Sequence, residues 1–174
     1  MKSADFVIIT SKYLRRSFEN YPDPVLAYGA YRASGAGGNF DTLIVNVNEL
    51  YNQFSYGETT PLAIHRFSRY MAENGNPRYI FIIGKGLTPN YNFYRKDFET
   101  QSIKDLVPTA GYPGSDILYT AGINGATHEA GIPIGRIAAK NPGEVVAYLE
   151  KVIEEEALVP TELWQKDLIH LSGG

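Results

Sequence analysis

The sequence predicts an α/β protein built on an open, mostly parallel sheet with helices flanking the sheet. Two observations support this fold class: short apolar, β-branched runs recur along the chain, and helix-forming stretches with clear start signals separate them. Strands that alternate with helices in this way form parallel pairs joined by right-handed crossovers. With 174 residues, 44% of them hydrophobic, the chain is long enough to bury one continuous core.

Several segments have the short, apolar and β-branched composition of strands that are covered on both faces. The clearest four are Phe6–Ile9, Thr42–Val47, Tyr79–Ile83 and Ile132–Ile137. Tyr79–Ile83 is the most apolar of them and is predicted to be the central strand. It runs into Gly84-Lys85-Gly86, at the edge where open α/β sheets place ligand-binding loops. Two further strands are predicted at Ile117–Thr120 and Asp167–Leu171.

Helices are predicted between these strands from periodicity and start signals. They are Ser11–Glu19, Val25–Ser34, a helix from Thr60 and Pro61 to Asn74, and a helix that begins at Asn141 and Pro142. In the last two, a polar N-cap precedes a first-turn proline, whose missing N–H would be unpaired there anyway. The stretch Asn48–Phe67 is interpreted as a buried-strand pattern joined to the sharply capped helix, with His65 on its solvated side.

The final predicted helix has the strongest start signal in the chain. Glu144 at its third position adds an acid that can return a hydrogen bond to the backbone at the cap. Its apolar stripe is predicted to be buried: Val145, Leu149, Val152 and Ile153.

The composition excludes several classes of function. With 16 basic and 19 acidic side chains the charge is nearly balanced, so no nucleic-acid partner is expected. The longest apolar runs are far shorter than the ~20 residues of a membrane helix, so no membrane span is expected. Met1–Ser3 leads almost at once into the first strand, so no signal peptide is expected in this segment. The absence of cysteine excludes disulfides, thiolate metal sites and a cysteine nucleophile within it.

Six short blocks occur in a fixed order along nearly the whole chain. They are Tyr51-x-x-Phe54-Ser55-Tyr56-Gly57, Thr60-Pro61-x-Ala63-Ile64, Ile82-Ile83-Gly84-x-Gly86, Gly114-Ser115-Asp116, Ile134-Gly135-Arg136, and Trp164 with Gly173-Gly174. Each block alone is a weak signal, but the ordered set resembles the gingipain family of cysteine peptidases. The resemblance implies a caspase-like α/β fold, with a Rossmann-like three-layer arrangement, made of two side-by-side subdomains.

The resemblance also implies a division of the chain near residue 140. Residues 1–140 resemble the N-terminal subdomain, and residues 141–174 resemble a helix and the first strand of the truncated catalytic subdomain. In that family the catalytic histidine and cysteine follow the Gly-Gly block, which would place both beyond Gly174. This segment alone is therefore expected to be inactive. Its expected partners are the remainder of its own chain and a protein or peptide substrate, and its expected location is secreted or at the cell surface.

Two positions depart from the family pattern. Lys85 stands where relatives commonly carry an aspartate, which reverses the charge at the end of the predicted central strand. In the best-known members an acid that assists the catalytic histidine aligns with Gly131 of this chain. Glu129, with His128 beside it, is the candidate substitute, because a carboxylate there could orient a histidine supplied from elsewhere. The alternative is that both residues are exposed in a loop that follows Gly125–Thr127.

Calcium is the one cofactor that the resemblance implies. The irregular middle of the chain carries four candidate ligands, Asp97, Glu99, Asp105 and Asp116, of which Asp116 is the leading one. Calcium prefers several oxygen ligands, and carboxylates supply them, although no EF-hand spacing is present. No other cofactor is predicted, since neither Gly84-Lys85-Gly86 nor the glycine-rich residues 35–38 match a phosphate-binding or dinucleotide-binding loop.

Two functional hypotheses from different classes follow. In the first, the chain is the non-catalytic N-terminal part of a secreted gingipain-like cysteine endopeptidase, which supports the catalytic half and shapes one wall of the substrate cleft. In the second, it belongs to a degenerate, non-proteolytic relative that acts in surface adhesion, secretion-associated processing or protein binding. A third possibility is a free-standing flavodoxin-like domain that binds a small ligand.

Overall fold

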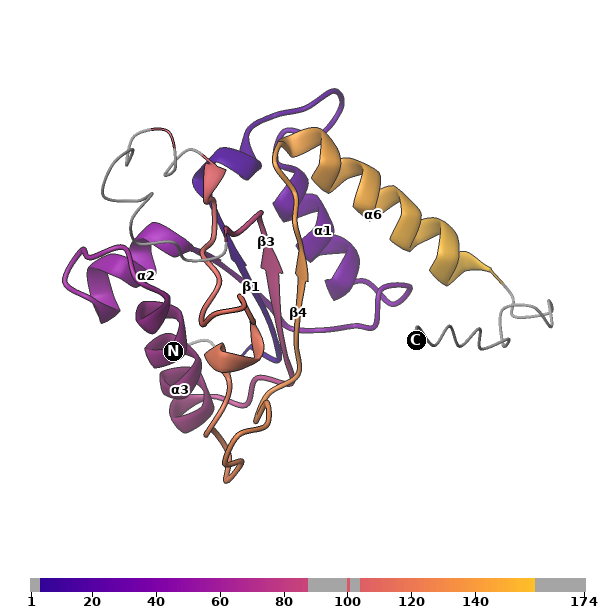
Figure 1. The fold of residues 1–174 in the computed structure, drawn as a ribbon. Helices are drawn as coiled ribbons and strands as arrows, with labels where there is room; N and C mark the ends of the chain where they lie inside the picture. Colours follow the sequence, from indigo (N-terminus) through magenta and orange to yellow (C-terminus); the bar gives the residue numbers. More distant parts are fainter. Residues whose placement is uncertain (1–3, 88–99, 101–103, 159–174) are drawn as a thin grey trace, which may run out of the picture.

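A four-stranded parallel sheet is the framework of the protein (Figure 1). The computed structural model describes residues 4–87, 100 and 104–158. The strands lie in the order β2-β1-β3-β4, and each of the three pairings is parallel. They are β1 (Phe6–Thr10), β2 (Thr42–Asn46), β3 (Tyr79–Ile83) and β4 (Ile134–Ile137). The predicted open, parallel α/β architecture is therefore confirmed, with β3 in the interior of the sheet.

Helices cover the sheet on both faces and make three layers. They are α1 (Pro24–Ala33), α2 (Val47–Phe54), α3 (Pro61–Asn74) and α6 (Pro142–Ala157), with short 3-10 helices η1 (Lys12–Arg15) and η2 (Ile117–Tyr119). Alternate residues of β1 point to opposite faces, as the period of a strand requires. Val7 and Ile9 pack into the core under α2 and α3, whereas Phe6 and Ile8 pack into the core under α1 and α6.

The start signals of the helices act as predicted. The Asp23 side chain accepts a hydrogen bond from the Leu26 N–H (2.9 Å), so α1 begins at Pro24. At α6, Asn141 accepts from the Glu144 N–H (3.1 Å) while the Glu144 carboxylate accepts from the Lys140 N–H (2.8 Å). These side chains satisfy N–H groups that have no partner inside the helix.

Aromatic and charged side chains join α6 to α1 and to the sheet. The ring of Tyr28 on α1 stacks on Phe81 of β3 (5.2 Å), which stacks on Tyr148 of α6 (5.9 Å). Burial raises the pKa of Tyr28 to about 12, and its hydroxyl accepts a hydrogen bond from Arg32 Nε (3.0 Å). Arg32 also pairs with Glu156 of α6 (2.8 Å). The helix α6 thus packs on the same layer as α1, while the predicted division at residue 140 stays a prediction.

Two predicted elements are wrong in type. The strand pattern after Asn48 is helix α2, which starts directly at the end of β2 because Asn46 accepts a hydrogen bond from the Asn48 N–H (3.0 Å). The segment Ile117–Thr120 forms the 3-10 helix η2 instead of a strand. The reason is tertiary: Tyr119 is completely buried and its hydroxyl donates to the carbonyl of Pro108.

Two other elements are shorter than predicted. Within Ser11–Glu19 only η1 forms, because the backbone of Arg16 is extended and Phe18 instead pairs with Tyr21. In α6 the predicted stripe is buried up to Leu149, but Ile153 is 39% exposed. Figure 1 shows that the second half of α6 diverges from α1, and the long side chains of Tyr31 and Arg32 reach across to Glu156 there. The predicted strand Asp167–Leu171 lies outside the described residues.

The described helices also bear on the membrane prediction. None of the helices in the described ranges is long and apolar enough to cross a membrane.

Candidate functional site

The carboxyl ends of the four strands lie along one edge of the sheet, called the carboxyl edge below. The chain leaves β1 toward β2 on one side and leaves β3 toward β4 on the other, so the connections diverge between β1 and β3. Open α/β sheets bind ligands at such a switch point. Here the hydroxyl of Thr10 donates a hydrogen bond to the carbonyl of Ile83 (3.0 Å) and ties the two central strands together.

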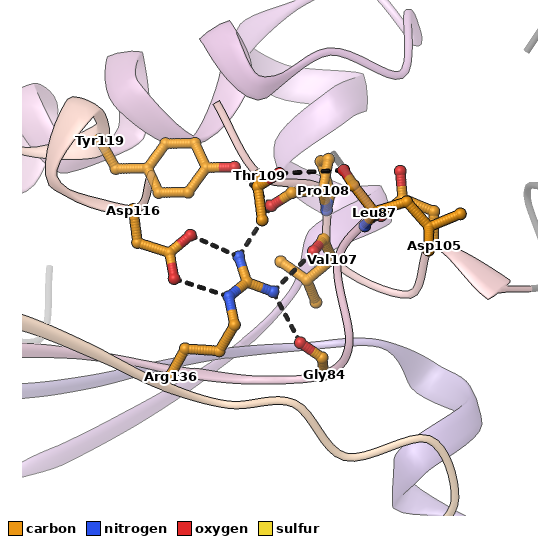
Figure 2. A network of polar contacts seen from close by, with 9 residues as sticks. All are labelled: Gly84, Leu87, Asp105, Val107, Pro108, Thr109, Asp116, Tyr119 and Arg136. Atoms are coloured by element: carbon orange, nitrogen blue, oxygen red, sulfur yellow. Dashed lines mark hydrogen bonds and ion pairs between the residues drawn. The ribbon is translucent and has the colours of Figure 1, made fainter. Parts of the chain in front are cut away.

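Arg136 of β4 is the centre of a polar network on the β3 and β4 side of this edge (Figure 2). Its side chain is only 10% exposed. It donates one hydrogen bond from Nε and two from each terminal nitrogen, to Gly84 O (2.6 Å), Val107 O (2.7 Å), Pro108 O (2.8 Å) and both carboxylate oxygens of Asp116 (2.7 and 2.8 Å). Since a guanidinium has five N–H groups, every donor is used.

The network fixes two backbone segments that are far apart in sequence. The N–H groups of Leu106 and Val107 donate to the carbonyl of Lys85 (2.9 and 3.2 Å). The Leu87 N–H donates to Asp105 Oδ1 (3.0 Å), and the Thr109 hydroxyl donates back to the Leu87 carbonyl (2.9 Å). Residues 84–87 and 105–109 therefore form one rigid platform above the end of β3, which we call the Arg136 platform.

Tyr119 closes the Arg136 platform from the side of η2. Its hydroxyl donates to the carbonyl of Pro108, and this carbonyl also accepts from Arg136. Burial raises the pKa of Tyr119 above its ordinary value, so the phenol keeps the proton that it donates.

Lys85 lies on this platform at the carboxyl end of β3. Its backbone is held, because its N–H donates to the Ala139 carbonyl (2.8 Å) and its carbonyl accepts from the segment after Asp105. Lys85 is half-buried. The backbone of a lysine is thus fixed at the carboxyl end of the internal strand β3.

A second feature of the edge is a polar cavity of about 550 Å³ at the ends of β1 and β2, called the charged groove below. It is lined by Lys12, Tyr13, Arg15, Arg16, Asp23, Asn46 and Glu49. Arg15 is paired with Asp23 (2.8 Å), and the guanidinium of Arg16 lies over the ring of Tyr13 (5.0 Å). Sequence reasoning did not single out this groove; the available signal was three basic residues within five positions directly after the first strand.

Comparison with known families decides the identity of the fold. The sequence model of peptidase family C25 matches residues 1–174, the whole chain. The chain belongs to peptidase family C25. This confirms the resemblance to the gingipain family that the six ordered blocks indicated. A comparison with curated proteins found no significant match.

A solved C25-like structure shares the fold. The crystal structure of dimeric latent PorU from Porphyromonas gingivalis matches with a TM-score of 0.65 and 16% sequence identity. The match covers 88% of this C25 chain but only 16% of the PorU chain. At this level of identity the comparison shows the fold.

The structure places His128 and Glu129 away from the carboxyl edge of the C25 fold. Both are exposed, in a loop whose ends are joined by a bridge between Ala121 and Ala130. Because this loop precedes β4, it lies at the amino end of that strand. Gly131 itself has no space for a side chain, since an added Cβ would lie 2.0 Å from the Ile123 carbonyl oxygen. The auxiliary role of Glu129 stays a prediction.

The calcium prediction meets a competing cation. Both carboxylate oxygens of Asp116 accept hydrogen bonds from Arg136, so a metal ion there would have to compete with the guanidinium. In the part of the chain that the structure describes, no group of three or more His, Cys, Asp or Glu side chains could hold a metal ion. Asp97 and Glu99 lie outside the described residues, and calcium binding in this C25 chain stays a prediction.

His65 is less solvated than predicted. It is half-buried on α3, and its Nδ1 lies 3.2 Å from the carbonyl oxygen of Leu118. It lines a shallow cavity of about 280 Å³ with five other residues, Pro61, Leu62, Ala110, Leu118 and Tyr119. The start of α3 therefore packs against η2 in this C25 chain through a histidine that sequence periodicity had assigned to solvent.

Proposed function

We propose that this chain is the N-terminal part of a cysteine endopeptidase of family C25, whose catalytic histidine and cysteine are supplied by the remainder of a longer protein. The observation that carries the proposal is the family match over residues 1–174. The 174 residues contain no cysteine, whereas attack by a thiolate requires one next to a base. The segment therefore supports the catalysis of a partner region and performs no turnover alone.

The carboxyl edge would form one wall of the substrate cleft. The Arg136 platform supports this role, because it holds the backbone at the end of β3 by contacts that do not depend on a ligand. In the proposed division, residues 1–140 form the supporting subdomain, and α6 leads into the catalytic one. A protein or peptide substrate would then cross the edge near Lys85 and Thr10.

Peptide hydrolysis by the full-length protein tests the proposal. We expect turnover of a mixed peptide library that iodoacetamide abolishes, since it alkylates a catalytic thiolate, and no turnover by the 174-residue segment. Turnover by the segment alone, or activity of the full-length protein that survives iodoacetamide, would overturn it.

A Glu129→Gln variant that loses kcat at unchanged KM would assign Glu129 its auxiliary role; unchanged kinetics would remove that role.

A degenerate relative without proteolysis is the second candidate, and one observation favours it. The backbone at Gly131, where an assisting acid aligns in the family, leaves no space for a side chain. In this case the full-length protein would fold and bind proteins without cleaving them. The same assay separates the two candidates, with folding checked by circular dichroism.

We also propose a secreted or cell-surface location, which immunoblotting of the culture medium and of surface-biotinylated cells would test.

A further inference from the structure

We propose that the charged groove binds the carboxylate side chains of an acidic peptide segment. The groove lies at the carboxyl ends of β1 and β2, on the far side of β1 from the Arg136 platform. Its volume of about 550 Å³ falls within the range of roughly 300–1,000 Å³ that is typical of ligand sites. This binding is separate from the proposed peptidase chemistry and does not depend on it.

The charges that face the groove leave an excess of positive charge. Three cations line it, Lys12, Arg15 and Arg16, against the carboxylates of Asp23 and Glu49. Asp23 is already occupied, because Oδ2 accepts from Arg15 (2.8 Å) and Oδ1 accepts from the Leu26 N–H (2.9 Å). Lys12 and Arg16 pair with no carboxylate in the described part of the chain, so two cations remain for a ligand.

The donors in the groove are held in place before a ligand arrives. Nε and Nη2 of Arg15 both contact Oδ2 of Asp23, and these two contacts fix the plane of the guanidinium. Its Nη1 donates no hydrogen bond to any described residue. Arg16 is oriented by the ring of Tyr13 beneath it. Asn46 and Glu49, the N-cap and an early residue of α2, line the same space, so the positive end of the α2 dipole adds to the potential.

The remaining lining residues favour a peptide over a compact anion. The Glu49 carboxylate repels any anionic group, but it can accept hydrogen bonds from the N–H groups of a peptide, which a phosphate lacks. Tyr13, with 39% of its surface exposed, adds apolar ring atoms to the groove for aliphatic carbons of the ligand. The chain as a whole has a net charge of −3, which opposes the extended contact with phosphates that nucleic-acid binding requires. The groove thus offers cationic donors for carboxylates, Lys12 and Arg16, next to an acceptor for peptide N–H groups, Glu49, and this combination matches an acidic polypeptide.

Fluorescence anisotropy with labelled hexaglutamate tests the proposal on the full-length protein, after iodoacetamide treatment so that cleavage cannot interfere. We expect hexaglutamate to bind, labelled hexalysine not to bind, and affinity to fall as salt is added. Lys12→Glu and Arg16→Glu should each weaken binding by about tenfold or more, because each converts an attraction into a repulsion. Glu49→Gln should strengthen it about twofold to threefold by removing a repulsion.

A matched control separates the groove from general electrostatics. Lys151 is exposed on α6, away from the groove, and Lys151→Glu changes the net charge by the same amount as Lys12→Glu. We expect Lys151→Glu to bind hexaglutamate as the wild type does. Because Lys12, Arg16 and Lys151 are all exposed, the three variants should keep the thermal midpoint of the wild type, which circular dichroism checks.

Each contrary result overturns the proposal. These results are a failure of hexaglutamate to bind, unchanged affinity in both groove variants, or an equal loss of affinity in Lys151→Glu. Displacement of hexaglutamate by an equal concentration of inorganic pyrophosphate would also overturn the proposal, because it would identify the groove as a phosphate site. Turnover of an acid-free peptide is measured in parallel; its absence bears on the peptidase proposal and leaves the binding result intact.

Discussion

Two stretches of the same sheet edge use arginine in opposite ways. On the β3 and β4 side, Arg136 is nearly buried and every one of its donors bonds within the protein. On the β1 and β2 side, Arg15 forms an ion pair with one carboxylate, that of Asp23, and Arg16 contacts only the ring face of Tyr13. Burial explains the difference, since an unpaired charge is tolerated in water but not in the interior. Saturated donors hold the fold, and unsaturated donors at the surface are the ones that can bind.

The largest expected effect comes from removing Arg136. Arg136→Met removes the donor to the carboxylate of Asp116, itself only 20% exposed, and to the carbonyls of Gly84 and Val107, whereas the Pro108 carbonyl still accepts from the Tyr119 hydroxyl. We expect a loss of about 3 kcal/mol or more in the free energy of unfolding, measured by urea denaturation. Arg69→Met, which removes an exposed pair with Glu73, is the control and should cost about 0.5 kcal/mol or less. Equal losses in the two variants would contradict the distinction between buried and exposed arginine.

The next effect concerns how closely the two segments of the Arg136 platform approach each other. A Cβ at Gly86 would lie 2.7 Å from both Thr109 Cγ2 and the Val107 carbonyl oxygen. Gly86→Ala should therefore destabilise the protein by about 1–3 kcal/mol, as overpacking does. At Gly35 an added Cβ meets nothing within 4 Å, so Gly35→Ala is the matched control. Thermal unfolding of both variants measures the difference, and a wild-type midpoint for Gly86→Ala would show that the platform yields.

Double-mutant cycles compare the two ion pairs directly. The coupling between Arg15 and Asp23 should be about 1 kcal/mol or less, because the Arg15 side chain is 35% exposed and water screens the pair. The coupling between Arg136 and Asp116 should exceed it at least about twofold, since their geometry is bidentate and largely buried. Urea denaturation of the single and double alanine variants gives both values. A larger coupling at Arg15 would reverse the assignment of structural and binding roles.

The smallest effect is a pH dependence of stability that comes from Glu156. This residue forms an exposed ion pair with Arg32, away from the carboxyl edge. Burial acts to raise the pKa of Glu156, but hydrogen bonds from Arg32 and Tyr31 outweigh it and hold the pKa below its usual range. The stability from these bonds is present above the unfolded pKa of about 4.3 and is lost as pH falls through the lowered value. Glu156→Gln should lower the unfolding free energy at neutral pH by less than about 1 kcal/mol. The difference should vanish in acid, and a gap that persists there would contradict this origin.

Local signals were sufficient to predict most of the framework. The apolar runs at β1, β2 and β3 and the polar caps before Pro61 and Pro142 depend on residues within one turn or one strand, so their physics is visible in the sequence. Helix α2 was missed because its start depends on Asn46, the last residue of a strand, and no loop separates the two elements. Pattern reasoning assigned its apolar residues to a strand for that reason.

The candidate site was much less predictable, because its contacts are long-range. Arg136 stood out only as part of a family block, and its partners at Gly84 and Val107 lie 52 and 29 residues away. Asp116 was predicted as a calcium ligand from its charge and from the family resemblance, because nothing in the sequence shows that a guanidinium bonds both oxygens of its carboxylate. The groove combines residues after β1 with residues after β2, and only the parallel pairing of those strands brings them together.

The hydrogen bonds between Lys85 and Leu106, and between Leu87 and Asp105, fasten two distant points of the chain to each other. The sheet below them therefore does not depend on how many residues connect these two points. Because the entropy of closing a loop grows only slowly with the number of residues, insertions between Leu87 and Asp105 should leave strand register and stability almost unchanged. An epitope tag inserted between Leu87 and Asp105 should therefore leave the sheet intact.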